Sequence, residues 1–340
     1  MEPRRSRVPV EGDFVETIEG LIFDVKGLVH PPDAVIAYVR YVPCARGTRK
    51  RGGTGYRKLY SLEEREKFLR MRYPEYIRFD PVFGTTVQAV PRGRIAVHYD
   101  PYVKLKDMML SEDLDPVEEA AVELARLMME EAGLGPGSVG VTGSILVGLH
   151  TDSSDIDLVV RGERNAKRAY AALLSLREEG LIEPYDDQMI RRLYRFRSED
   201  TPLPFEVFTK MESRKVLQGI FRGREFYVRL IKEREECGER YGDRVYVPLG
   251  TQRIRAEVVD AEDSIFTPCK YIVSNVEVLE GPRQTTVREV VSLRGRFCEL
   301  AREGERIVAR GKLELVRCRD GSSHYRLLLG RRGDYMYTVG

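Results

Sequence analysis

Two residue patterns alternate along this chain of 340 residues, and the alternation limits the folds that are open to it. Near both ends, short runs rich in β-branched and aromatic residues are separated by Gly, Pro and Asp, a pattern typical of strands and turns. In the middle, residues 117–132 carry apolar side chains at helical spacing, after a capping Asp115 and before Gly133. The sequence therefore predicts an α+β, multidomain chain. We expect a small central α/β domain with a mixed sheet, flanked by an N-terminal β-rich domain and a C-terminal small β-barrel or sandwich.

Changes in this pattern place the expected domain boundaries. We expect an N-terminal domain over residues 1–108, a central domain over 109–237 and a C-terminal domain over 244–340. The segment CGERYGDR between the last two is polar and contains glycines, as linkers often do.

Within the central domain the order of elements is that of a small α/β unit. Short strands are expected at 138–143, 155–160 and 203–210, because these runs are apolar and β-branched or aromatic. The chain from Ser213 to about Cys237 is expected to be helical.

Composition excludes several classes of protein. No run approaches the roughly 18 consecutive apolar residues of a membrane span, and the first residues lack the apolar stretch of a signal peptide, so we expect a cytoplasmic protein without membrane segments. The five cysteines form no CxxC pair and the four histidines no HExxH motif, which argues against a zinc site. Arginine outnumbers lysine and only two asparagines occur, which favours a heat-adapted, archaeal protein.

The stretch most informative about chemistry is GSILVGLHTDSSDIDLVV, residues 143–160. Alternate side chains of a strand share a face, so Asp155 and Asp157 are expected to point the same way. Two unpaired carboxylates at this spacing repel each other, and a hard divalent cation with oxygen ligands relieves the repulsion. The pair therefore predicts a site for a hard divalent cation at the edge of a buried strand.

A Gly-Ser pair precedes these aspartates. Gly143 lets the backbone come close to a ligand, and the amides after Ser144, at the start of a short helix, can face an anion. We therefore expect phosphate and metal to meet at this point.

Together these residues make the middle of the chain similar to the DNA polymerase β-like nucleotidyltransferase superfamily. The signature of that superfamily is a Gly-Ser turn, a short helix, and Ser-Asp-x-Asp opening an apolar strand. It stands here as Gly143, Ser144, Ser154, Asp155 and Asp157. The resemblance covers roughly residues 111–235, and in the flanking domains we recognise no family.

The resemblance also implies a third carboxylate on a neighbouring strand. Glu206 is the best match, because it is an acid inside the apolar run PFEVF; the rival acids Asp186, Asp187 and Glu199 lie in polar stretches. The chain departs from the family pattern in using Glu here, and in placing Val147 where many small members carry an arginine.

By this resemblance the chain would move a nucleoside monophosphate from an NTP to a hydroxyl, with release of pyrophosphate. Asp155, Asp157 and Glu206 would be the catalytic residues and would hold two Mg²⁺ or Mn²⁺ ions. Gly143, Ser144 and Ser154 would bind the phosphates of the nucleotide.

The sequence says less about the acceptor of the nucleotidyl group than about its donor, the NTP. A Gly-rich basic loop over residues 46–58 is a candidate contact for a polyanion, so RNA is slightly preferred. Its cations are Arg46, Arg49, Lys50, Arg51, Arg57 and Lys58. Two alternatives stay open: a non-catalytic nucleic-acid-binding protein with a relic nucleotidyltransferase domain, and an enzyme that modifies a protein or a small molecule.

Overall fold

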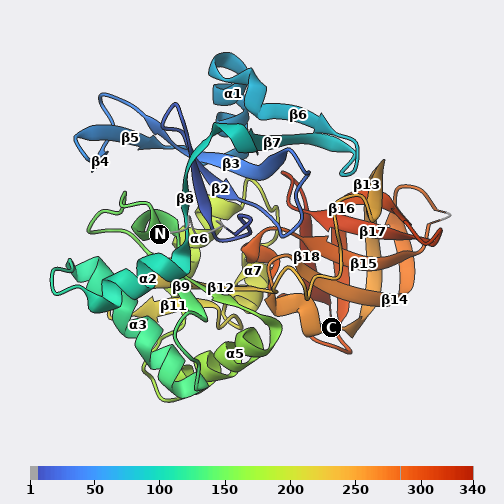
Figure 1. Cartoon of the computed structure of the whole chain (residues 1–340). Helices are drawn as coiled ribbons and strands as arrows, with labels where there is room; N and C mark the ends of the chain where they lie inside the picture. Colours follow the sequence, from blue (N-terminus) through green and yellow to red (C-terminus); the bar gives the residue numbers. More distant parts are fainter. Residues whose placement is uncertain (1–6, 284, 340) are drawn as a thin grey trace.

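A computed structural model describes residues 7–283 and 285–339 of the chain. Its strands form three sheets, of eight, four and six strands, each from a continuous part of the chain (Figure 1). The architecture is α+β, as expected. The three sheets fall within the expected ranges 1–108, 109–237 and 244–340, of which residues 1–6, 284 and 340 lie outside the described ones. Division into separate domains at these limits stays a prediction.

The N-terminal part of the chain forms an antiparallel sheet. Its strands are β1 (Phe14–Thr17), β2 (Ile22–Val25), β3 (Ala34–Pro43), β4 (Arg49–Arg51), β5 (Thr54–Lys58), β6 (Ile77–Asp80), β7 (Thr85–Pro91) and β8 (Ile95–Tyr99). They pair in the order β4-β5-β3-β2-β1-β8, and the β6–β7 hairpin joins the sheet through β3. Helix α1 (Leu62–Arg72) and the 3₁₀ turns η1 (Pro74–Tyr76) and η2 (Arg92–Arg94) lie in its connections.

The middle of the chain forms a mixed sheet. Its strands are β9 (Val139–Val141), β10 (Ile156–Arg161), β11 (Gln218–Phe221) and β12 (Arg224–Ile231), in the order β11-β12-β10-β9. Strands β10 and β12 run parallel, and the outer pairs are antiparallel. The helices of this part are α2 (Pro101–Leu110), α3 (Pro116–Ala132), α4 (Gly143–Leu146), α5 (Glu163–Glu178), α6 (Asp187–Arg197) and α7 (Phe205–Glu212). Helix α2 crosses the boundary expected at residue 108.

The two faces of β10 are covered by different parts of the chain. Ile156, Leu158 and Val160 belong to the core that α3 and α5 form below the sheet (Figure 1). Val159, on the other face, packs with Val10 and other residues of the N-terminal part. The face that carries Asp155 and Asp157 is therefore covered by the N-terminal part of the chain and by the start of α2, whose Tyr102 packs with Val159.

The C-terminal sheet curls round on itself. Its strands are β13 (Arg244–Asp260), β14 (Cys269–Glu280), β15 (Val287–Ser292), β16 (Arg306–Cys318), β17 (Ser323–Leu329) and β18 (Tyr335–Val339). The order is β13-β14-β15-β17-β16-β18, and β13 also pairs with β16, which brings the sheet back to its first strand. Two 3₁₀ turns, η3 (Glu262–Ile265) and η4 (Gly295–Phe297), lie in the connections.

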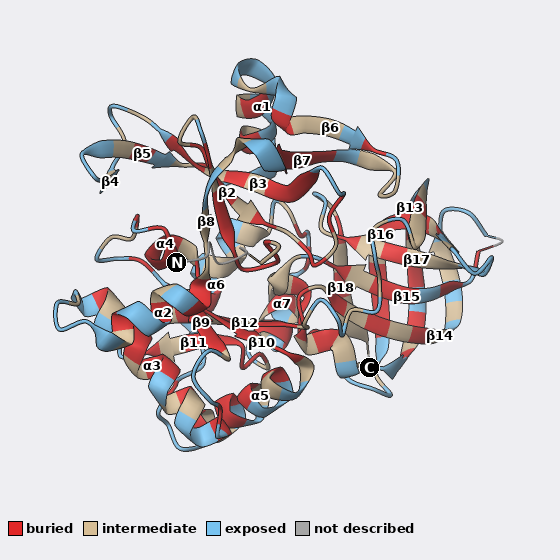
Figure 2. Cartoon of the chain, viewed as in Figure 1, coloured by how far each residue is buried: buried red, intermediate tan, exposed pale blue. Residues whose placement is uncertain are grey.

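Residues close in sequence determine where helix α3 begins and ends. The Asp115 carboxylate accepts the backbone N–H groups of Val117 and Glu118, and Gly133 ends the helix in the left-handed conformation. Its buried residues recur at helical spacing and face the mixed sheet, as the inner side of the helix in Figure 2 shows. This confirms the helix predicted at 117–132.

Three local predictions are wrong. The run 203–210, expected as a strand, lies mostly in helix α7, whose buried Phe208 and Met211 recur at helical spacing. The segment from Ser213 to Cys237, expected as a helix, forms the hairpin of β11 and β12, because Arg222 and Gly223 both take positive φ in its turn. The basic loop 46–58 is a hairpin of β4 and β5.

In the part of the chain that the structure describes, no helix is both long enough and apolar enough to span a membrane.

Candidate functional site

The Gly-Ser turn and the second aspartate of the motif meet at one point. Gly143 opens helix α4 directly after β9 with a φ of +67°, and a Cβ atom at this position would lie 2.1 Å from Asp157 Oδ2. The backbone is fixed there because the Thr142 N–H donates to the Asp157 carbonyl oxygen at 2.8 Å. Only glycine permits this approach, so the turn and the carboxylate form one unit.

Two serines of the motif have different surroundings. Ser144 is buried, at 3% exposure, and its Oγ has no hydrogen-bond partner among the described residues. Ser154 is also buried, but its Oγ accepts the Thr151 N–H at 2.9 Å. An unpartnered buried hydroxyl costs free energy unless a ligand bonds to it, so Ser144 is the better placed of the two to hold a phosphate oxygen.

The two aspartates influence each other's ionisation. Asp155 is exposed directly before β10. Asp157 lies two residues further on, within the strand, and is partly buried. Burial, and next the charge of Asp155, raise the pKa of Asp157 to about 7, while Arg229 and Lys58 act in the opposite direction. Two carboxylates that repel at neutral pH offer oxygen ligands to a hard divalent cation, which would remove the repulsion.

Cations from the N-terminal sheet lie near these carboxylates. Arg40 on β3 and Lys58 on β5 are among the groups that lower the pKa of Asp157, and neither forms an ion pair within residues 7–283 and 285–339. Burial lowers the pKa of Lys58 to about 8, with Arg40 adding to the shift and Asp155 opposing it. The face with the acids thus also carries two cations that no carboxylate pairs within the described residues, of which Arg40 donates to the carbonyl oxygen of Leu59 at 3.0 Å.

The β4–β5 hairpin is fixed to the segment after Ser144. Arg51 donates to the carbonyl oxygen of Val147 at 3.1 Å and pairs with Glu16 at 2.7 Å, and Arg49 donates to the carbonyl oxygen of Leu149. Both guanidinium groups therefore lie around Val147, the position at which many small members of the resembling superfamily carry an arginine.

The remaining predicted cations of the hairpin are spread over its surface. Arg46 and Lys50 are exposed, and Arg57 pairs with Glu64 at 2.7 Å. Three of the six cations predicted from the sequence therefore face the motif: Arg49, Arg51 and Lys58. The other three face solvent.

Glu206, the predicted third carboxylate, does not lie on a strand. Glu206 is exposed in the first turn of α7, and no strand carries it. The strand parallel to β10 is β12, and its register sets Phe226 beside Ile156 and Tyr227 beside Asp157. One residue earlier, this register places Glu225 beside Asp155 on the same face of the sheet. The side chain of Glu225 contacts Arg192 of α6.

A second group of possible ligands lies outside the motif. The side chains of Asp115, Glu118 and His150 offer ligand atoms within 4.8 Å of one another. Each acid already has partners: Asp115 caps α3 and contacts His150, and Glu118 pairs with Lys104 at 2.9 Å. The sequence had identified Asp115 only as a helix cap.

Comparison with known proteins identifies the central part of the chain. A family model described as a nucleotidyltransferase domain matches residues 123–237, which include the Gly-Ser turn and both aspartates. Residues 123–237 therefore form a nucleotidyltransferase domain. The resemblance to the DNA polymerase β-like superfamily, stated from the motif, is thereby confirmed for this middle part.

The similarity to one relative extends over nearly the whole length. The chain is 31% identical over 327 residues to the uncharacterized protein MJ1086 of the archaeon Methanocaldococcus jannaschii, and the alignment covers 94% of each chain, so the two proteins belong to one family. No solved structure matches the chain. The N-terminal sheet with Lys58 thus lies outside the family model but inside the similarity to the archaeal relative.

Sequence reasoning missed three charged residues that lie near the two aspartates. They are Arg40, Arg229 and Glu225, and each is a charged residue within a strand. Glu206 had been chosen for a similar reason, as an acid inside an apolar run. What the sequence lacked was the pairing of β12 with β10 and the fold of the N-terminal sheet over them.

Proposed function

We propose that this nucleotidyltransferase moves a nucleoside monophosphate from an NTP to a hydroxyl, with release of pyrophosphate and with Mg²⁺ or Mn²⁺ bound, two ions per site. The observation that carries the proposal is the packing of Gly143 directly against the Asp157 carboxylate, which brings a phosphate-binding turn and an acidic pair to one point. The unpartnered Ser144 hydroxyl supports it, because a polar atom buried at such a turn suits a phosphate oxygen.

The donor groups present fit a divalent cation. Asp155 and Asp157 offer carboxylate oxygens, the ligands that Mg²⁺ prefers, and their mutual repulsion would be relieved on binding. When bound, the ions would neutralise the charge of the triphosphate and of the attacking oxygen.

The chain's own residues would align the reactants. Ser144 would donate to a phosphate oxygen, and Lys58 and Arg40 would balance the negative charge that the triphosphate brings to the acids. Asp155 would lie nearest to the entering hydroxyl, because it is the exposed member of the pair. Positioning and charge balance account for most of the catalysis in phosphoryl transfer.

We propose Glu225, in place of Glu206, as the third carboxylate. We expect Glu225→Gln to lower kcat by at least about tenfold, because it removes an acid beside Asp155. Glu206→Gln should leave kcat within about twofold, since the side chain is exposed on α7. Arg192→Gln serves as a control for loss of the ion pair with Glu225. Single-turnover rates at saturating Mg²⁺ measure the effect, and a large loss in Glu206→Gln with none in Glu225→Gln would reverse the assignment.

The lowered pKa of Lys58 predicts a pH dependence of activity. Because its pKa is about 8 in the free protein, Lys58 loses its charge as the pH rises through 8, and kcat/KM for the NTP should fall above that pH. Lys58→Arg keeps the charge at every pH used and should lack this decline. Profiles of kcat/KM from pH 6.5 to 9.5 compare the two proteins. An identical alkaline decline in Lys58→Arg would exclude Lys58 as its cause.

RNA is our preferred acceptor, on two grounds. Arg46 and Lys50 are exposed on the hairpin beside the site and are free to meet a polyanion. The C-terminal strand order, a ring of β13-β14-β15-β17-β16 with β15 and β17 parallel, is that of the OB-fold, which commonly binds single-stranded nucleic acid. The second ground is an analogy of fold.

The test of the proposed function is to incubate the protein with each α-labelled NTP, Mg²⁺, and separate fractions of cellular RNA, protein and metabolites. We expect label in the RNA fraction, and its loss when Asp155 and Asp157 are replaced. Label in the protein or metabolite fraction would keep the reaction and change the acceptor. Salt-sensitive RNA binding without any transfer would favour the non-catalytic alternative, and Arg46→Gln with Lys50→Gln should weaken that binding.

A further inference from the structure

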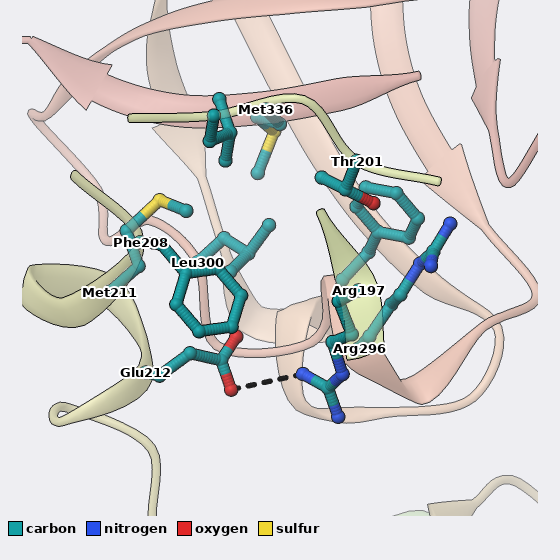
Figure 3. A pocket seen from close by; sticks show the side chains of 10 residues that line it. Arg197, Thr201, Phe208, Met211, Glu212, Arg296, Leu300 and Met336 are labelled. Atoms are coloured by element: carbon teal, nitrogen blue, oxygen red, sulfur yellow. Dashed lines mark hydrogen bonds and ion pairs between the residues drawn. The ribbon is translucent and has the colours of Figure 1, made fainter. Parts of the chain in front are cut away.

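One side of helix α6 is fixed to the rest of the chain. Ile190 is buried, and the Tyr194 hydroxyl donates to the carbonyl oxygen of Leu203 at 2.8 Å. Arg197, at the end of the helix, pairs with the buried Glu212 of α7 at 3.0 Å, an ion pair that Figure 3 shows. These contacts determine which side of α6 faces away from the protein.

The opposite side of α6 is basic and carries an aromatic ring. It consists of three arginines and a phenylalanine, all exposed, which we call the α6 face: Arg191, Arg192, Arg195 and Phe196. Phe196 has an exposed fraction of 72%. Residues four apart on a helix are neighbours, with Cβ atoms about 5–6 Å apart, so Arg191 lies next to Arg195 and Arg192 next to Phe196. The whole helix holds four arginines against one aspartate, so its net charge is positive.

Two arginines of the α6 face have no acidic partner. Arg191 lies over the Phe205 ring at 4.8 Å, and neither Arg191 nor Arg195 forms an ion pair in the part of the chain that the structure describes. Like charges at this spacing destabilise a helix, and the exposed ring of Phe196 gains no free energy from burial. A ligand with negative charges and flat apolar rings would offset both costs.

The third arginine connects the α6 face to the acidic pair. The Arg192 guanidinium contacts Glu225, the residue that the register of β12 places beside Asp155. Arg224, one residue earlier, donates to the carbonyl oxygen of Asp152, in the loop that leads to Asp155. A strand bound on the α6 face therefore has a short path to Asp155, which we propose lies nearest to the entering hydroxyl.

A single strand of RNA has the chemistry that the α6 face lacks. Its phosphates supply negative charge to Arg191 and Arg195, and its unpaired bases offer flat faces for the ring of Phe196. Cations beside aromatic rings are the usual composition of single-strand sites. A duplex keeps its bases stacked inside, and an acidic protein segment would satisfy the arginines without any need for an exposed ring.

We infer that the α6 face binds the single-stranded end of an RNA acceptor and leads it toward Asp155. The inference rests on the proposed function, because it identifies the surface that holds the acceptor of that reaction. Arg191, Arg195 and Phe196 contact the strand, whereas Arg192 holds Glu225.

Binding of a fluorescent single-stranded RNA of mixed sequence to the full-length chain, in EDTA and without NTP, tests the inference apart from any transfer. We expect Arg191→Gln with Arg195→Gln to raise the Kd at least about tenfold in low salt. The slope of log Kd against log salt concentration should fall by about 1.4, since each phosphate contact of a single strand contributes about 0.7.

Arg164→Gln with Arg168→Gln is the matched control. It removes the same charge from an exposed arginine pair four residues apart on α5, which covers the opposite face of the mixed sheet. The Kd should stay within about twofold of the wild type, because long-range attraction alone is weakly affected by two distant charges. RNA that binds the α6 double variant as tightly as it binds this control would overturn the inference.

Phe196→Ala tests the stacking of bases. We expect the Kd to rise at least about fivefold with an unchanged salt slope, because a stacking surface is lost and no charge is. Phe196→Tyr keeps the ring and should bind as the wild type does. Polyglutamate in place of RNA tests for an acidic protein partner: equal affinity for polyglutamate, with no effect of Phe196→Ala on either ligand, would contradict the inference.

The same variants separate this inference from the proposed function. Transfer of nucleotide to RNA that does not depend on the α6 face would refute the inference and keep the proposed reaction. RNA binding that depends on the α6 face, in a chain that transfers no nucleotide, would refute the reaction and keep the α6 face as a binding surface for RNA.

Discussion

Replacing both aspartates of the motif with asparagine should reduce nucleotidyl transfer by at least about 1000-fold, equivalent to about 4 kcal/mol of transition-state stabilisation. Asp155 and Asp157 supply the charged oxygens of the site, and asparagine keeps their shape while removing the charge that a divalent cation needs. The rate of pyrophosphate release at saturating NTP and Mg²⁺ measures the loss.

The same variant should fold at least as well as the wild type at neutral pH without metal. The pKa of Asp157 is raised from 3.8 to about 7, so its ionisation destabilises the folded state increasingly between about pH 4 and 7, and asparagine removes this effect. Urea unfolding in EDTA at pH 8 checks it. A double variant that is stable yet turns over at the wild-type rate would remove the proposed reaction.

The second large effect is expected from Gly143→Ala. The new methyl group would lie 2.1 Å from Asp157 Oδ2, and alanine is strained at a φ of +67°, so the turn and the carboxylate must move apart. We expect a loss of at least about 100-fold in kcat/KM, since small displacements in such sites are costly, together with about 1–3 kcal/mol of stability.

Gly148→Ala is the matched control for this change. Gly148 has a similar φ of +64°, but its Cβ would meet only Arg51, at 3.6 Å, in ordinary contact. The variant carries the same backbone strain without displacing Asp157, so its stability should fall while kcat/KM stays within about fivefold. Equal losses of activity in the two variants would show that strain, and not the approach to Asp157, limits function.

The local part of this site was predictable from the sequence. Alternation in residues 155–160 placed Asp155 and Asp157 on one face, and the Gly-Ser pair marked the turn before them. Both are properties of short segments, set by the strand period and by the freedom of glycine. Asp115 predicted the start of α3 for the same reason.

The helical position of Glu206, and the position of Glu225 beside Asp155, were not predictable in this way. The run around Glu206 alternates apolar and polar residues over only a few positions, and its Phe205, Phe208 and Met211 also match helical spacing, so the run fits either element. The partner of β10 is decided by pairing between segments about 70 residues apart. Local pattern carries no information about such pairing.

The sequence could not predict which cations lie near Asp155 and Asp157, for a similar reason. Lys58 lies almost 100 residues before Asp155, and only the fold of the N-terminal sheet over β10 brings it close. The sequence did indicate a basic segment at 46–58, but as one surface. In the structure the cations of this segment have different surroundings: Arg51 is paired with Glu16, whereas Lys50 is exposed to solvent.

The most direct measurement of the central claim is the position of Mn²⁺ in crystals grown with a non-hydrolysable NTP, located by anomalous scattering. The account predicts Mn²⁺ bound by oxygens of both Asp155 and Asp157, at roughly the 2.1 Å typical of such small hard cations, with phosphate oxygens beside Ser144. Mn²⁺ bound only by Asp115, Glu118 and His150, with no metal between the two aspartates, would contradict it.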